Sequence, residues 1–389
     1  MNAYRLKLCG IACAGSLMLA ACGGGGGYSG GMVVLPIAGT ATGTTTATAM
    51  SPVAGMSYVP TNLVSDLPAA SNPYGSANSD PHLVNAWGVA FNPRGFVWVT
   101  NTGTSTSTLY DGTGAPQSLV VSIPAGAAGS ALPTGIVFNS HQNFTVTKNG
   151  KSGASAFIFA GEAGTLSGWS PGVDMTNAVT VFDDGAAGTR YTGLGLASQG
   201  ASDFLYAADF GHAKVDVFDT NFKKASMPGS FVDQAMPPGY APFGVQAIGG
   251  LIYVSYAIQD AAARNAVAGA GQGAVDVFDA AGNLVKRLVP VGGVLNAPLG
   301  MAMAPGDFGT FSNALLVANV GDGKINAFDP TSGVMMGTLS TSDGNPVAID
   351  GLRGIAFGNG LNNQPTNTLF FAAGPSGGIH GVYGRIDNH

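Results

Sequence analysis

Short apolar stretches separated by polar turns follow one another along most of the chain. Many consist of a glycine followed by apolar positions, a pattern that predicts short, buried β-strands. One such motif occurs six times, and its glycines are separated by 47, 58, 51, 56 and 54 residues. This regular spacing indicates an internal repeat. The six glycines are Gly88, Gly135, Gly193, Gly244, Gly300 and Gly354.

Each copy of the repeat contains further strand-like stretches. A second apolar stretch follows the glycine motif, at residues 97–99, 157–159, 205–207, 252–254, 315–317 and 369–371. A third ends with an aromatic residue, at Tyr110, Trp169, Phe218, Phe278, Phe328 and Tyr383. A fourth, more variable stretch completes the copy, as at residues 118–121. Six repeats of four strands predict an all-β fold, a six-bladed β-propeller with four-stranded antiparallel blades.

The last copy is too short to supply its own outer strand. After Tyr383 only residues 384–389 remain, whereas the strand-like segment 58–64 precedes the first copy. We therefore expect this N-terminal strand to close the last blade, which would leave no open sheet edge at the seam. The predicted propeller domain spans residues 58–389.

The N-terminal residues have the pattern of a targeting segment. Arg5 and Lys7 precede a short apolar run, and Leu19-Ala20-Ala21-Cys22 matches the lipobox of bacterial lipoproteins. We predict a lipoprotein signal peptide over 1–22, with lipidation at Cys22; an ordinary secretory signal is the alternative. Residues 23–57, rich in Gly, Ala and Thr, would form a flexible tether.

Charge and cysteine usage restrict the partners. All three cysteines lie in the leader, so the predicted mature domain has no thiol for a disulfide or a zinc site. Without the two basic leader residues, 13 basic groups face 21 acidic ones, a net charge of −8, which argues against nucleic acid. We expect a monomer in the bacterial cell envelope, lipid-anchored at the outer membrane or periplasmic face. An envelope protein or polysaccharide would be its partner.

Polar residues near the ends of the second strands are candidates for a ligand site at the mouth of the central channel. They are Asn101, Glu162, Asp209, Tyr256, Gln259, Asp260 and Asn319. Oxygen-bearing side chains around an axis suit a hard cation, so a calcium ion is one hypothesis. The alternative is that these side chains cap turns by accepting backbone N–H bonds. No other cofactor and no catalytic residue is predicted.

The repeat resembles NHL-type repeats, through its Gly-led strand, Tyr206-Ala207-Ala208-Asp209 and Val215-Asp216-Val217-Phe218-Asp219. Residues 58–386 also resemble a family of uncharacterised exported bacterial propellers, through Leu83-Val84-Asn85-Ala86-Trp87-Gly88 and His380-Gly381-Val382-Tyr383-Gly384. That family implies the fold but no activity. Lactonase propellers are a second comparison, but they hold a metal partly through an Asn before an inner-strand glycine. Here those positions are Trp87, Thr134, Thr192, Phe243, Leu299 and Arg353.

Three functions remain open on these observations. The favoured one is a binding or scaffold module for a protein, an envelope polymer or a small ligand. The alternative is a hydrolase or lactonase-like enzyme with its site at the channel mouth, and the third is a structural envelope component. The sequence has no P-loop, and its five histidines lack metal-ligand spacing. Enzymatic activity is therefore the less favoured interpretation.

Overall fold

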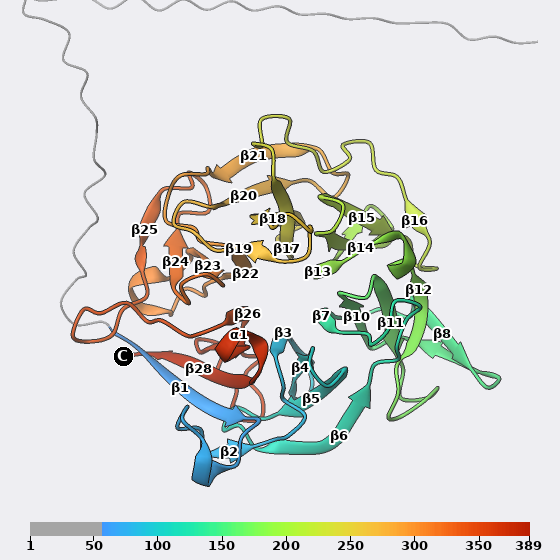
Figure 1. The fold of residues 1–389 in the computed structure, drawn as a ribbon, viewed down its shortest axis with the longest axis horizontal. Coiled ribbons are helices and arrows are strands. Elements are labelled where there is room, and N and C mark those ends of the chain that lie inside the picture. Colours follow the sequence, from blue (N-terminus) through green and yellow to red (C-terminus); the bar gives the residue numbers. More distant parts are fainter. Residues whose placement is uncertain (1–56) are drawn as a thin grey trace, which may run out of the picture. The chain divides into compact units, whose positions relative to one another are not determined.

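Six antiparallel β-sheets surround a central axis in the computed structural model, which describes residues 57–389 (Figure 1). We number these sheets blades 1 to 6 in chain order. The innermost strand of each blade contacts that of the next blade, and the innermost strand of blade 6 contacts that of blade 1. The predicted six-bladed β-propeller is confirmed. The predicted leader, Cys22 and residues 23–56 of the predicted tether lie outside the described residues.

The blades are formed by the following strands, given from the axis outwards. Blade 1 has β3 (Ala86–Phe91), β4 (Val97–Asn101), β5 (Thr106–Tyr110) and β6 (Pro116–Ser122). Blade 2 has β7 (Pro133–Phe138), β10 (Phe157–Gly161), β11 (Thr165–Trp169) and β12 (Val179–Asp183). Blade 3 has β13 (Tyr191–Gln199), β14 (Ser202–Asp209), β15 (Lys214–Phe218) and β16 (Lys224–Ala225).

The second half of the ring follows the same plan. Blade 4 has β17 (Tyr240–Ile248), β18 (Leu251–Gln259), β20 (Gly273–Phe278) and β21 (Leu284–Val289). Blade 5 has β22 (Pro298–Met303), β23 (Leu315–Asn319), β24 (Ile325–Phe328) and β25 (Met335–Thr338). Blade 6 has β26 (Leu352–Phe357), β27 (Leu369–Ala373), β28 (Val382–Asn388) and, as its fourth strand, β1 (Tyr58–Ser65).

A few short elements decorate this plan. The strands β2 (Asn78–Ser79) and β19 (Ala266–Val267) pair with β1 and β18, and β8 (Thr145–Lys148) and β9 (Lys151–Ala154) form a separate hairpin. Three single turns of 3-10 helix occur at Ala69–Ser71, Gly185–Ala187 and Gly309–Phe311, and one helical turn, α1, at Pro375–Gly378. Among the described residues, no helix has the length and apolar character needed to cross a bilayer.

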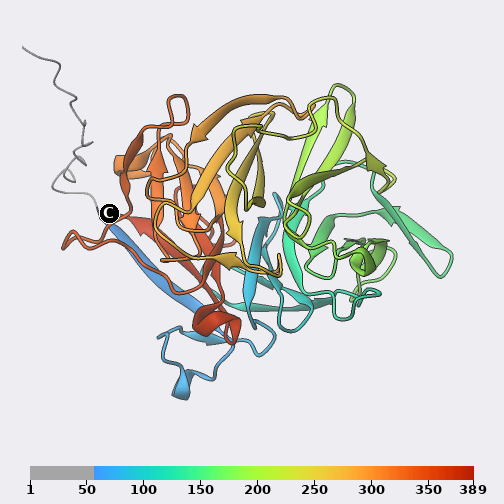
Figure 2. The same cartoon turned by 45° about the horizontal axis from the view of Figure 1, so that its top comes forward.

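The strand β1 closes the ring, as the sequence predicts. It pairs antiparallel with β28 from Tyr58 opposite Asn388 to Ser65 opposite Val382 (Figure 2, blue beside red). Its apolar side chains Tyr58, Leu63 and Val64 are buried. The Tyr58 hydroxyl donates a 2.9 Å hydrogen bond to the carbonyl of Phe308 in blade 5. The first described strand is thus held by backbone pairing and by packing at the seam.

The six aromatic residues predicted to end the third strands pack between blades. Five of them do end these strands, whereas Tyr383 is the second residue of β28. All six are buried, from Tyr110 in blade 1 to Tyr383 in blade 6. Trp169 lies 4.8 Å from Trp98 of blade 1, and Tyr110 stacks on Tyr383 at 5.1 Å between ring centroids. Large rings remove much apolar surface from water, so these contacts hold neighbouring blades together.

Candidate functional site

The central channel is formed by the six inner strands, and the repeated glycines determine how closely these strands approach. A Cβ atom at Gly244 would lie 2.1 Å from the carbonyl oxygen of Leu299 in the next blade. At Gly354 it would lie 2.5 Å from the carbonyl oxygen of Trp87. The other four glycines also abut the next inner strand. Only a residue without a side chain allows this spacing.

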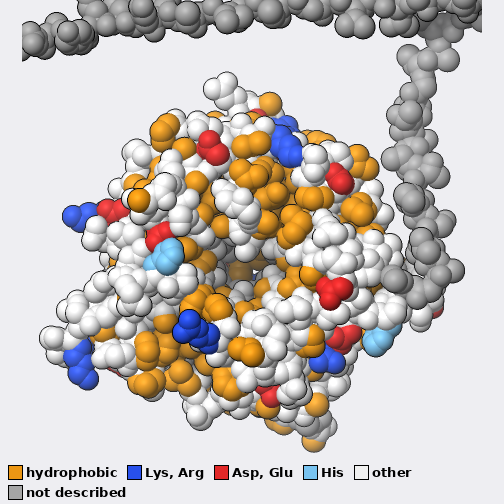
Figure 3. Space-filling model, turned by 180° about the vertical axis from the view of Figure 1, so that it is seen from behind, with side chains coloured by type: hydrophobic (Ala, Val, Ile, Leu, Met, Phe, Trp, Pro, Cys, Tyr) orange, Lys and Arg blue, Asp and Glu red, His pale blue; other side chains and the backbone are white. Residues whose placement is uncertain are grey.

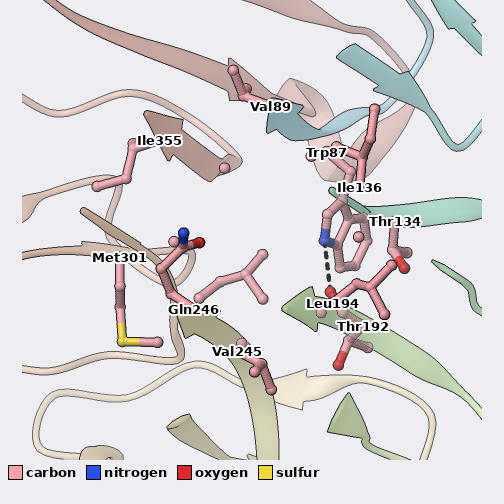
Figure 4. Close-up of a pocket in the computed structure, with 17 residues that line it drawn as sticks. Trp87, Val89, Thr134, Ile136, Thr192, Leu194, Val245, Gln246, Met301 and Ile355 are labelled. Carbon is pink, nitrogen blue, oxygen red and sulfur yellow. Dashed lines mark hydrogen bonds between the residues drawn. The ribbon is translucent and has the colours of Figure 1, made fainter. Parts of the chain in front are cut away.

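At the end where the inner strands begin, which we call the plugged end, side chains cross the axis. Trp87 reaches from blade 1 to blade 3, where its Nε1 donates a 3.1 Å hydrogen bond to the carbonyl of Thr192 (Figure 4). Its ring packs edge-on against Phe243 of blade 4, and the Cζ atom of Arg353 lies 3.9 Å from its centroid. Trp87 belongs to a hydrophobic cluster that draws residues from blades 1, 3, 4 and 5. This cluster closes the channel at one end.

The opposite end, the wide end, is a cavity of about 390 Å³. Seen from behind, the molecule is hollowed at its centre, with hydrophobic side chains on the wall (Figure 3). All six inner strands contribute to the lining, which includes Phe91, Phe138, Leu194, Leu196, Ile248, Met303, Ile355 and Phe357. Gln246 supplies the one polar side chain of this lining, is exposed, and projects toward the middle of the channel (Figure 4).

Three of the residues predicted to bind a ligand are buried within separate blades. Asn101 donates to the hydroxyls of Thr106 and Thr108 inside blade 1, both at 3.0 Å. Asp209 accepts from the backbone N–H of Arg190 and from Nδ1 of His212. Asn319 donates to the Val294 carbonyl and to Asp322. Each side chain thus fixes local backbone or strand neighbours, and the structure does not bring these three side chains together.

Tyr256 lies in a buried polar cluster of blade 4. Its neighbour Asp276 is fully buried, and neither carboxylate oxygen has a hydrogen-bond partner among the described residues. Burial and the nearby Asp233 carboxylate raise the pKa of Asp276 to about 7, against the opposing effect of Arg287. The Nε atom of Arg287 lies 3.6 Å from Asp276, and Arg287 is also paired with Asp233. One guanidinium therefore serves two carboxyl groups.

The substitution Asp276→Asn is expected to stabilise the protein above pH 7. An unfolded Asp titrates near pH 4, so between about pH 4 and pH 7 the folded protein retains a proton that the unfolded chain releases. Stability therefore falls as the pH rises through that window. Asn removes this component and is expected to raise the free energy of unfolding at pH 8 on the order of 2–4 kcal/mol. Urea unfolding of the variant and the unaltered protein at pH 5 and pH 8 measures this difference in the free energy of unfolding.

The exposed Asp307 provides a matched control for this substitution. Asp307→Asn is expected to leave the pH dependence unchanged, because Asp307 lies outside the cluster of Asp276, Asp233 and Arg287. If the stability of Asp276→Asn depends on pH as that of the unaltered protein does, the retained proton is bound by a group other than Asp276.

The remaining predicted residues lie at or just beyond the ends of second strands, at the plugged end. Glu162 follows β10, is largely buried, and forms a 2.6 Å ion pair with Nη2 of Arg190. Burial raises the pKa of Glu162, although Arg190, Arg353 and Arg264 act in the opposite direction. Gln259 donates to the carbonyl of Phe210. Asp260 is half-buried and accepts from the backbone of Arg264, which makes it a turn cap.

Of the seven predicted ligand residues, only Glu162 is placed in a cluster of charged groups at the channel mouth. In the range 57–389 no three His, Cys, Asp or Glu side chains are grouped so as to hold a metal ion. The calcium ion stays a prediction of the sequence.

Sequence reasoning did not single out Arg353 or Gln246 as site residues. Both carried a signal, because Arg353 is the one charged residue among the six that precede the repeated glycines. Gln246, in turn, is the one polar residue among the six that stand two positions after them.

The fold and the channel define a β-propeller protein with a cavity on its axis. Comparison by sequence found three uncharacterized proteins of Acanthamoeba polyphaga mimivirus. Protein R648 is 35% identical over 316 residues, covering 80% of this chain and 76% of its own. Protein L690 is 34% identical over 289 residues, which cover 72% of this chain and 75% of its own length. The chain belongs to the family of these proteins. They are viral proteins, whereas the resemblance in the sequence had led us to expect exported bacterial relatives. No family model matches the chain.

Solved structures share the fold at low sequence identity. A structural genomics protein of unknown function from Bacteroides thetaiotaomicron has a TM-score of 0.52 and 10% identity, over 86% of this chain and 77% of that one. Virginiamycin B lyase from Staphylococcus aureus has a TM-score of 0.47 and 12% identity, over 86% of this chain and 99% of the lyase chain. At these identities the comparison shows the fold alone.

Proposed function

We propose that the protein is a non-catalytic binding module that takes a small ligand with an apolar body into the wide end of its channel. The observation that carries this proposal is the cavity of about 390 Å³, whose wall combines apolar side chains, one exposed amide and exposed polar backbone groups. This volume lies within the range of small-molecule sites, roughly 300–1,000 Å³. Transfer of apolar groups from water onto such walls is favourable.

The ligand would also meet hydrogen-bonding groups. Each inner strand ends its sheet, so only one of its two edges is paired within the blade. The unpaired edges of strands that line the channel can offer backbone N–H and C=O groups. Together with Gln246, they suit a ligand that combines an aliphatic or aromatic body with one neutral polar group.

Filling the cavity from Gln246 is expected to weaken ligand binding. In Gln246→Trp, the indole would occupy the space that the ligand needs, and we expect the affinity for an apolar probe such as 1-decanol to fall at least tenfold, about 1.4 kcal/mol. The folded state should keep its melting temperature without ligand, because the replaced side chain is exposed. Calorimetric titration of both proteins measures the affinity.

A matched control carries the same substitution on the outer strand β6. Gln117→Trp lies away from the channel and is expected to bind 1-decanol as the unaltered protein does. Equal binding by Gln246→Trp would contradict the assignment of the cavity, and no saturable binding by the unaltered protein would contradict the apolar ligand class.

The alternative function is a hydrolase or lactonase-like enzyme. One titratable pair supports it. His141 is half-exposed and lies three residues after the cavity-lining Phe138, and its Nδ1 atom is 2.5 Å from a carboxylate oxygen of Asp203. We favour binding, because the cavity wall itself is formed by apolar side chains and one amide. Turnover of simple esters or lactones, lost in His141→Ala, would instead support the enzyme.

We also propose a place for the module in the cell. The lipobox ending at Cys22 supports a lipid anchor in the bacterial cell envelope, at the outer membrane or periplasmic face. An envelope protein or polysaccharide would then be within reach of the channel. The low density of charge, 9% of residues, suits partners bound through apolar contacts and hydrogen bonds.

A further inference from the structure

The plugged end concentrates guanidinium groups from separate parts of the ring. Arg190 precedes β13 of blade 3, Arg264 lies in the loop between β18 and β19, and Arg353 is on β26 of blade 6. All three act electrostatically on one carboxylate, Glu162. The cluster of Arg190, Arg264, Arg353 and Glu162, which we call the arginine cluster, therefore has an excess of positive charge in a chain that is acidic overall.

Arg353 has more buried N–H groups without a hydrogen-bond partner than any other member of the arginine cluster. Its guanidinium stacks on Trp87, 3.9 Å from the ring centroid. Its Nε and Nη1 atoms are hidden from solvent and have no hydrogen-bond partner within residues 57–389. Within residues 57–389 Arg353 forms no ion pair with a carboxylate, and Glu162 is paired with Arg190. Burial lowers the pKa of Arg353 to about 10, so it stays charged at neutral pH.

Such an arrangement is costly unless an anion completes it. Buried charges in proteins are nearly always paired, and an unpaired N–H of a charged group loses its hydration without compensation. Arg190 adds a further donor, because its Nε is also buried without a partner among the described residues. Guanidinium groups preferentially bind the oxygens of carboxylates and phosphates.

We propose that the arginine cluster binds an oxyanion group of a ligand, with Arg353 as the principal contact and Arg190 as the second. The site is distinct from the wide end of the channel, since Trp87 and its cluster lie between the two. Glu162 limits the affinity of this site for an anion, because its carboxylate repels the anion and is already paired with Arg190. The protein would therefore have an anion site at the plugged end and an apolar site at the wide end.

Two substitutions should change anion binding in opposite directions. Acetate and inorganic phosphate, each titrated against sodium chloride at equal ionic strength, are expected to raise the melting temperature of the unaltered protein saturably. Arg353→Met should abolish this response. Glu162→Gln should lower the apparent dissociation constant about threefold or more, because it removes the repelling charge and frees Arg190. The anion with the larger response identifies the ligand as carboxylate or phosphate.

Arg94→Met is the matched control, because Arg94 is exposed in the turn between β3 and β4. It should respond as the unaltered protein does. An undiminished response in Arg353→Met, or responses to acetate and phosphate no larger than to chloride, would overturn the proposal. If Arg353→Met does not fold, Glu162→Gln decides the question, since general destabilisation does not tighten binding. Unchanged or weaker binding in Glu162→Gln would also overturn it. Decanol binding is unaffected in every case.

Discussion

Deletion of residues 58–66 is expected to remove most of the stability of the protein. The deletion takes away the whole of β1 and with it the antiparallel pairing to β28. It also removes the buried side chains of Tyr58, Leu63 and Val64, worth about 6 kcal/mol together at ~2 kcal/mol each. Domains have a total stability of only about 5–15 kcal/mol, so the truncated ring would be marginal. Thermal and urea unfolding of the full-length and deleted proteins measure the loss.

Two valines within β1 provide a sharper version of the same test. Val64 is fully buried at the seam, whereas Val59 is 42% exposed on the same strand. Val64→Asp places a charge in the core and is expected to cost several kcal/mol, while Val59→Asp should cost about 0.5 kcal/mol or less. Equal effects of the two substitutions, or an unchanged melt after the deletion, would mean that the last blade is closed in another way.

The substitution Gly244→Ala is expected to destabilise the protein by about 3 kcal/mol or more. Its Cβ would lie 2.1 Å from the carbonyl oxygen of Leu299 and 2.7 Å from the hydroxyl of Ser255. The first of these atoms is backbone of the neighbouring inner strand, so relief requires blades 4 and 5 to separate. Gly244 does not have a positive φ, so the penalty reports packing and not backbone strain.

Gly172→Ala is the control for the glycine ring. A Cβ there would meet no atom within 4 Å, and its φ is not positive. Alanine should be neutral or stabilise by about 0.4–1 kcal/mol, because it restricts the unfolded chain. Urea unfolding curves of both variants give the comparison, and similar stabilities would show that the inner strands are further apart than described.

Sequence reasoning was sufficient for the architecture because the repeat imposes the same physical demands six times. A glycine where inner strands touch and an aromatic residue between blades recur in every copy, as at Gly88 and Tyr110. The closing role of β1 followed from chain length, because residues 384–389 could not supply an outer strand. The structure confirms each of these features.

The candidate site was less predictable, because it depends on the direction of side chains near strand ends. Successive residues of a strand point to opposite faces, so Asn101 and Asn319 turn into their own blades although both end second strands. The approach of Glu162 to Arg190 and Arg353 brings together three blades, which no spacing in the sequence reveals. The single Arg and the single Gln in the repeated inner-strand positions were visible in the sequence.

The propeller encloses a channel that Trp87 plugs at one end, and we propose that an apolar ligand enters at the other. The most direct test is an experimental structure of the protein crystallised with 1-decanol. We predict electron density for the alkyl chain along the axis, between the side chain of Gln246 and the side chains of Phe91, Phe138 and Phe357. Decanol bound only on the outer surface of the blades, or a wide end filled by the protein's own side chains, would contradict the claim.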